Sequence, residues 1–141
     1  MPQAIPYLAF DGTCADAMRF YEATLGLGAK LVMLVSGADS PMADQIPADQ
    51  RHRILHARIV FEDGSLLYAG DTPVGMPFDG MKGVTITMNY PDAAEAERVF
   101  ATLAEGGQVM MPIAEMFYAK RAGMLVDRFG TAWAINGELK M

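Results

Sequence analysis

Hydrophobic and polar positions follow two different periods along the chain, and these periods predict its helices and strands. Apolar residues recur at helical spacing after Thr13 and again after Asp92, both residue types that favour helix N-caps. Gly26 and Gly106 are natural stops for these two segments. We therefore expect two amphipathic helices, each packed against a sheet.

Strands are predicted where apolar residues alternate with polar ones or form short runs. The predicted strands cover approximately residues 4–10, 28–36, 53–62, 65–70, 82–90, 107–113, 121–127 and 131–136. Combined with the two helices, this gives the element order βαβββ, followed by a second βαβββ.

An internal repeat supports this order. A shift of 79 residues superposes Asp16 on Glu95, Ala17 on Ala96, Arg19 on Arg98 and Gly28 on Gly107. We expect a single domain, residues 1–141, made of two modules at approximately 1–75 and 80–141. The fold class is α+β, with the paired modules forming a cupped eight-stranded mixed sheet and two main helices. The segment GADSPMADQIPADQR is a predicted mobile loop, and TPVGMPFDGMKG is the predicted link between the modules.

Composition and charge exclude several classes of function. Of the 141 residues, 52% are hydrophobic and 20% are charged, which is typical of a compact globular protein. The net charge of −6 speaks against a nucleic-acid partner, because phosphate binding needs a clustered excess of Lys and Arg. No apolar run reaches membrane-spanning length, and the first residues lack the pattern of a signal peptide. Since Cys14 is the single cysteine, we expect a cytoplasmic protein.

Three stretches carry a family resemblance: IPYLAFDGTCADAMRFYEATLG, LHARIVFEDGSLLYAGD and MFYAKRAGMLVDRFGTAW. With the paired βαβββ modules, they resemble the glyoxalase, or vicinal oxygen chelate, superfamily, and within it the PhnB-like (demethylubiquinone-methyltransferase-like) branch. The resemblance covers nearly the whole chain. It implies a cup-shaped sheet in which the enzymes of the superfamily hold a divalent metal through His and Glu ligands from four strands.

The ligand positions implied by this resemblance fall on Pro6, Thr85 and Ala134. None of these side chains binds a divalent metal well, and only His56 could still serve as a ligand. A catalytic site needs about three protein ligands. We therefore expect no metal and no other cofactor.

Other polar residues are assigned to the cup by strand alternation. Leu55, Ala57 and Ile59 make one uniformly apolar strand side, which is expected to face a helix. The residues expected to line the cup are His56, Arg58, Thr85, Thr87 and Asn89, and those expected on a capping loop are Tyr118, Lys120 and Arg121. An imidazole, a guanidinium and several hydroxyl or amide groups suit a small polar or anionic ligand.

Simpler roles compete with ligand binding at some positions. For His56, a packed strand residue is favoured over a proton-transfer group. Arg58 is equally well explained by an ion pair with a carboxylate across the sheet. Asp71 is interpreted as a turn residue, Cys14 as a small buried side chain and Trp133 as a helix-facing core residue.

Three functions remain open at this point. The first is a protein that binds or converts a small polar or anionic metabolite without the usual metal. The second is a metal-dependent lyase, isomerase or dioxygenase with ligands such as His56, Asp71 and a Glu, and the third is a non-catalytic dimeric sequestering protein. We expect a homodimer because open sheet edges need covering. The expected partners are a second copy and a small molecule, with no nucleic acid and no membrane.

Overall fold

A computed structural model describes residues 2–73 and 75–141 of the chain. These residues form two compact units, Met1–Gly80 and Met81–Met141, called module 1 and module 2 below. Part of the predicted link, Val74, lies outside the described residues. No helix in the described part of the chain is long and apolar enough to cross a membrane.

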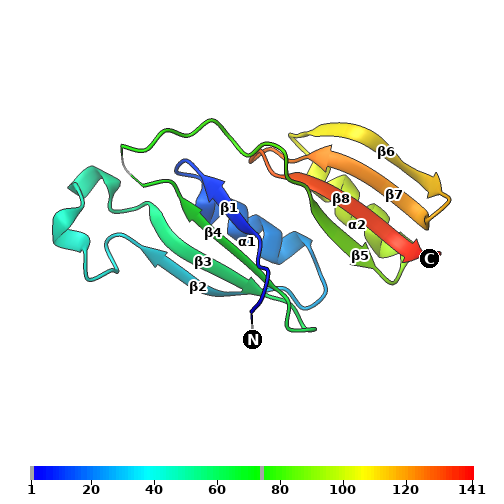
Figure 1. The fold of residues 1–141 in the computed structure, drawn as a ribbon, viewed down its shortest axis with the longest axis horizontal. Coiled ribbons are helices and arrows are strands. Elements are labelled where there is room, and N and C mark those ends of the chain that lie inside the picture. Colours follow the sequence, from blue (N-terminus) through cyan, green and yellow to red (C-terminus); the bar gives the residue numbers. More distant parts are fainter. Residues whose placement is uncertain (1, 74) are drawn as a thin grey trace. The chain divides into compact units, whose positions relative to one another are not determined.

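Module 1 is a four-stranded mixed sheet with one helix packed against it (Figure 1). The strand order is β1-β4-β3-β2, with β1 and β4 parallel and the other neighbours antiparallel. Its elements are β1 (Tyr7–Phe10), α1 (Cys14–Thr24), β2 (Lys30–Ser36), the short 3-10 helices η1 (Ala43–Gln45) and η2 (Ala48–Gln50), β3 (Ile54–Val60) and β4 (Leu66–Asp71).

Module 2 repeats this topology, with strand order β5-β8-β7-β6. Its elements are β5 (Ile86–Tyr90), α2 (Ala93–Ala104), β6 (Gln108–Met116), β7 (Ala119–Val126) and β8 (Ala132–Leu139). The predicted α+β fold of paired βαβββ modules is therefore confirmed. The eight strands form two four-stranded mixed sheets, one in each module.

The core of each module lies between the sheet and its helix. In β3, Ala57 and Ile59 are fully buried, as their place on the apolar strand side predicts. Leu55, expected on the same side, is instead 41% exposed. The cause is a shift in the register of β2 and β3 between Val35 and Ser36, which interrupts the alternation at this point.

Trp133 confirms the predicted helix-facing core position in β8. It is fully buried, and its indole Nε1 donates a hydrogen bond of 2.8 Å to Oδ2 of Asp127. Asp127 also accepts hydrogen bonds from the backbone N–H groups of Phe129 and Thr131, so the turn before β8 is closed by one buried carboxylate.

Equivalent positions of the two modules are related by two different sequence shifts. Cys14 and Ala93, the first residues of the helices, are 79 residues apart, whereas the buried last residues of β1 and β5, Phe10 and Tyr90, are 80 apart. The strand-to-helix connection is one residue longer in module 1. The shift of 79 residues pairs Pro6 with Thr85, but the strands are related by a shift of 80, so this pairing is off by one position. Both residues lie just before their strands, β1 and β5.

Candidate functional site

The first candidate pair lies on β3, on the sheet face of module 1 that points away from α1. His56 and Arg58 are both partly exposed, and Nε of Arg58 donates a hydrogen bond of 2.7 Å to Nε2 of His56. An imidazole nitrogen that accepts a hydrogen bond carries no proton, so neutral His56 has its proton on Nδ1. The pair thus presents an imidazole N–H and the remaining N–H groups of a guanidinium.

Two tyrosines surround this pair. Tyr68 of β4 meets His56 edge-on, with ring centroids 4.8 Å apart, and the guanidinium carbon of Arg58 lies 4.8 Å from the centre of the Tyr68 ring. Tyr7 of β1 is the register partner of Tyr68, and its ring centroid is 5.9 Å from that of His56. The cluster Tyr7, His56, Arg58 and Tyr68, called the aromatic–cation cluster below, therefore covers three neighbouring strands.

Arg58 has no carboxylate within ion-pair distance among the described residues. The alternative that it forms an ion pair across the sheet therefore lacks support. Stacking on Tyr68 and the bond to His56 hold the side chain in place without neutralising its charge.

The pKa of His56 is lowered from its ordinary value, first by burial and second by the charge of Arg58. The imidazole is therefore neutral at neutral pH, which is the form that accepts the hydrogen bond from Arg58. Because Nε2 is already occupied, the nitrogen left for a ligand is Nδ1, and it acts as a donor.

The candidates on β5 belong to module 2. Thr87 and Asn89 are exposed on the strand face opposite the helix, as predicted, and Oδ1 of Asn89 accepts a hydrogen bond of 3.0 Å from Asn136 of β8. Thr85 is exposed but precedes β5, which begins at Ile86 and not at residue 82 as predicted. These residues form an uncharged polar strip of hydroxyl and amide groups.

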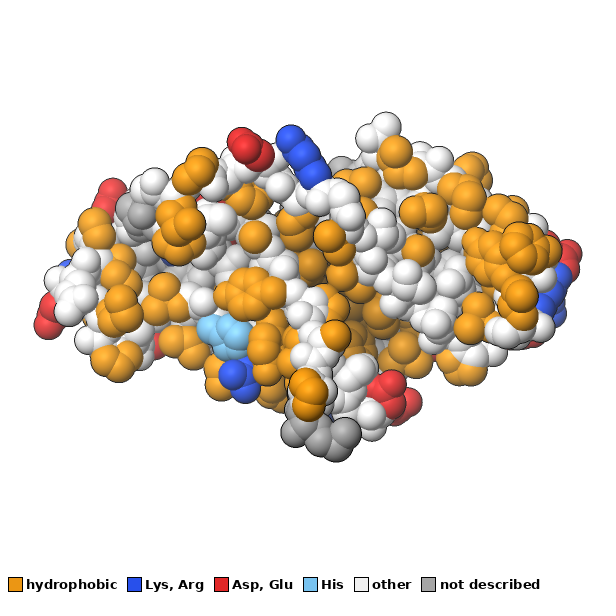
Figure 2. Space-filling view, in the orientation of Figure 1, with side chains coloured by type: hydrophobic (Ala, Val, Ile, Leu, Met, Phe, Trp, Pro, Cys, Tyr) orange, Lys and Arg blue, Asp and Glu red, His pale blue; other side chains and the backbone are white. Residues whose placement is uncertain are grey.

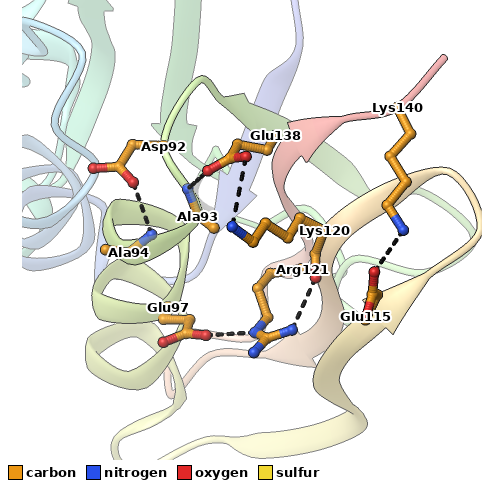
Figure 3. Close-up of polar contacts among 9 residues, drawn as sticks. All are labelled: Asp92, Ala93, Ala94, Glu97, Glu115, Lys120, Arg121, Glu138 and Lys140. Carbon is orange, nitrogen blue, oxygen red and sulfur yellow. Dashed lines mark hydrogen bonds and ion pairs between the residues drawn. The ribbon is translucent and has the colours of Figure 1, made fainter.

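The expected capping loop contracts to a tight turn at Phe117 and Tyr118. Lys120 and Arg121 lie on β7 and not in a loop, because that strand already begins at Ala119. Both have acidic partners (Figure 3): Arg121 pairs with Glu97 of α2, and Nζ of Lys120 lies 4.0 Å from Oε2 of Glu138. Their charges are compensated within module 2, unlike the charge of Arg58.

A cavity of about 380 Å³ opens beside the aromatic–cation cluster in module 1. Its floor includes Tyr7, Ala9 and Leu55 from the strands, and its wall includes Met42 and Ile46 from the segment between β2 and β3. The segment predicted as a mobile loop thus contains η1 and η2 and forms a cavity wall. The volume lies within the range of small-molecule pockets.

A divalent metal does not fit the donors of this site. His56 would have to give up the hydrogen bond from Arg58, and a cation would then lie beside an uncompensated guanidinium. Asp71, the other candidate ligand, already uses both oxygens to accept backbone N–H groups of Gly12, Cys14 and Ile54. Among residues 2–73 and 75–141, no group of three or more His, Cys, Asp or Glu side chains could hold a metal ion.

Asp71 is therefore more than a turn residue, since it ends β4 and anchors the start of α1. The Thr13 side chain, expected as the N-cap, makes no capping hydrogen bond, and Asp71 satisfies the backbone N–H groups in its place. Burial and the charge of Asp71 raise the pKa of the Cys14 thiol to about 12. This fits the predicted role of Cys14 as a small buried side chain.

Tyr7 and Tyr68 are residues of the site that the sequence analysis missed. A signal for them was present: Tyr7 and Ala9 alternate with Leu8 and Phe10, which are buried. The same alternation holds for Tyr68 in β4.

The architecture defines the class of protein. Two βαβββ modules, each a four-stranded mixed sheet with one helix, make up the glyoxalase, or vicinal oxygen chelate, fold, which solved structures of glyoxalase-family proteins share with this chain. A family model described as 3-demethylubiquinone-9 3-methyltransferase matches residues 2–136, and the chain belongs to this family, the PhnB-like branch expected from the sequence.

Relatives cover almost the whole chain. Protein YjdN of Escherichia coli (strain K12) is 30% identical in an alignment of 139 positions, and the match covers 93% of this chain and 92% of YjdN. The crystal structure of protein PA1353 from Pseudomonas aeruginosa is 41% identical, with a TM-score of 0.86 and 98% coverage of both chains. A PhnB protein from Bacillus cereus has a TM-score of 0.79 at 22% identity, covering 96% of this chain and 99% of its own, and shows the fold alone.

Proposed function

We propose that the protein binds a small polar or anionic metabolite at the aromatic–cation cluster of module 1, without the divalent metal used by other members of the fold. The observation that carries this proposal is the state of Arg58. Its guanidinium is held by His56 and Tyr68, is partly exposed and has no carboxylate partner among the described residues. A fixed, uncompensated guanidinium is suited to a bidentate contact with a carboxylate, phosphate or phosphonate.

The geometry supports binding by His56 more than proton transfer. Nε2 accepts from Arg58, so abstracting a proton with this nitrogen would break the bond that orients the guanidinium. Nδ1–H remains free to act as a donor to a bound ligand. Both Arg58 and His56 then offer N–H donors, and neither offers a base.

The first testable prediction concerns ligand preference. Small organic anions should raise the melting temperature of the protein, whereas amines of similar size should not. Arg58→Ala should weaken anion binding by at least about 10-fold, because a charge-assisted contact is worth about 1.5–3 kcal/mol. The measurement is a thermal-shift screen followed by calorimetric titration of the anions that stabilise the protein.

Arg98→Ala is the matched control for this experiment. Arg98 is exposed on α2 of module 2, and its removal changes the net charge equally while every residue of module 1 stays the same. The proposal is contradicted if no anion raises the melting temperature. It is also contradicted if the Arg58→Ala and Arg98→Ala proteins bind equally well.

We also propose that the protein is a homodimer. The edge strands expose large apolar side chains: Val32 and Met33 on β2, and Val109 and Met110 on β6. Hydrophobic side chains also make up much of the face shown in Figure 2. Exposed strand edges of this kind are normally covered, and a second copy is the simplest cover.

A further inference from the structure

The cavity beside the aromatic–cation cluster is lined largely by apolar groups. Ala9, Leu55 and Pro73 come from the strands and their ends, and Met42, Ile46 and Pro47 come from the segment between β2 and β3. An apolar group of a ligand that enters such a lining leaves water, and this burial lowers the free energy of the complex. The lining matches an apolar part of a ligand and not a second charged group.

Hydrogen bonds to backbone groups hold the wall of this cavity in place. Nε of Arg51 donates to the carbonyl oxygens of Ala43 at 2.8 Å and Ile46 at 3.0 Å. The two ends of the segment are joined where the N–H of Gly37 donates to the carbonyl oxygen of Arg53 at 3.0 Å. The apolar wall is thus fixed opposite the strands and leaves the cavity open between them.

Tyr7 connects the cavity to the cluster. Its side chain is 54% exposed, lines the cavity and lies 5.9 Å, between ring centroids, from His56. A molecule lying across the Tyr7 ring would therefore reach the cavity at one end and the Arg58–His56 pair at the other. The aromatic face itself favours an apolar segment.

The charge of the arginine that lines the cavity is paired with a carboxylate, although its buried Nε has no hydrogen-bond partner among the described residues. Arg53 lines the cavity, but its Nη2 lies 2.9 Å from Oδ1 of Asp11 and also donates to the carbonyl oxygen of Thr72 at 2.8 Å. Arg58, unlike Arg53, has no carboxylate partner among the described residues. The charged end of a ligand is accordingly directed to Arg58 and its apolar end to the cavity.

We infer that module 1 takes an amphipathic organic monoanion, with a carboxylate or similar head on Arg58 and an apolar body in the cavity under the segment 42–50. This inference rests on the proposed function, since it assigns the ligand class of the same site. It adds a second requirement, an apolar body, that anion binding alone does not contain.

The test is a titration of the full chain with butyrate, hexanoate and octanoate, which share one head group. Affinity should rise by up to about 4-fold for each methylene that enters the cavity. Ala9→Leu, which fills the cavity floor, should remove most of this dependence on chain length, so that octanoate loses far more affinity than butyrate. Ala101→Leu, which adds the same atoms on the exposed face of α2, should keep the dependence.

A second variant keeps the test valid if Ala9→Leu does not fold. Leu55→Ser removes apolar lining at a partly exposed position and should weaken octanoate binding several-fold more than butyrate binding. Binding that is sensitive to Arg58→Ala but equal for the three chain lengths would overturn this inference and leave the proposed function intact. Absence of binding for all three carboxylates would overturn this inference, and anion binding that is insensitive to Arg58→Ala would overturn both.

Discussion

Arg58 and His56 constrain each other chemically. The charge of Arg58, after burial, keeps the pKa of His56 low, and the resulting neutral imidazole accepts the hydrogen bond that orients the guanidinium. Protonating His56 would break this bond and place two positive charges side by side. The folded protein therefore favours the unprotonated imidazole.

This coupling predicts a pH dependence of stability. In the unfolded chain His56 binds a proton with an ordinary pKa of about 6.5, whereas the folded state binds it less readily. The unfolded state then holds more protons below this pH, so the free energy of unfolding should fall as the pH drops through about 6.5. Urea denaturation at pH 7.5, 6.5 and 5.5 should show a shallower pH slope for His56→Gln than for the wild type.

His52→Gln serves as the control for that experiment, because it removes an exposed imidazole four residues away from His56. If His56→Gln and His52→Gln change the slope equally, the specific coupling of His56 to Arg58 is refuted.

Strand alternation was sufficient to predict that His56 and Arg58 share a face, because β3 is regular between them. It could not predict their hydrogen bond, which depends on side-chain rotamers, nor the absence of a nearby carboxylate. The contact with Tyr7 and Tyr68 depends on how β1, β4 and β3 are aligned, and the pattern within one strand does not contain that register.

Asp71 joins three elements of module 1. Its Oδ1 accepts from the backbone N–H groups of Gly12 at 2.8 Å and Cys14 at 3.1 Å, at the start of α1, and its Oδ2 accepts from Ile54 of β3 at 2.8 Å. The carboxylate thus holds the helix start and β3 at the end of β4, beside the cavity.

Asp71→Asn should destabilise the protein by about 1–3 kcal/mol. The amide keeps one acceptor oxygen but presents an NH₂ group to a backbone N–H, which is then left without an acceptor. Asp49→Asn, at an exposed position in η2, should change stability by less than about 0.5 kcal/mol. Chemical denaturation of both variants measures the difference, and equal stabilities would show that Asp71 is not an anchor.

The order of helices and strands was predictable because every element shows its hydrophobic periodicity. The predicted bounds were in error only at the ends of elements. The largest consequence came at β7, which begins at Ala119, two residues before the predicted start at residue 121, so that Lys120 and Arg121 both lie within the strand and not in a capping loop. Their acidic partners, Glu138 and Glu97, lie on β8 and α2, and the sequence gives no direct sign of such pairs between elements.

The two modules have the same topology but different chemistry on their sheets. Module 1 carries the aromatic–cation cluster and the cavity formed by an insertion that module 2 lacks, whereas the corresponding face of module 2 presents Thr87 and Asn89. Repetition of the fold therefore does not repeat the site, and we propose that ligand binding is confined to module 1.

The assembly prediction follows from the exposed strand edges. Light scattering coupled to size-exclusion chromatography at micromolar concentration should give about twice the chain mass of 15.3 kDa. Val109→Lys and Met110→Lys, placed together on the edge strand β6, should shift the mass toward that of the monomer if this edge is buried in the dimer. A monomer mass for the unmodified protein would contradict the proposal.

Anion binding by Arg58 can be observed at the guanidinium itself by NMR of arginine side chains. In ¹⁵N-labelled protein, the Nε–H resonance of Arg58, assigned by its loss in Arg58→Lys, should shift saturably as hexanoate is added. The resonance of Arg121, which is paired with Glu97, should stay in place. We expect a saturable shift confined to Arg58, and an unmoved Arg58 resonance at saturating hexanoate would show that Arg58 does not bind the carboxylate.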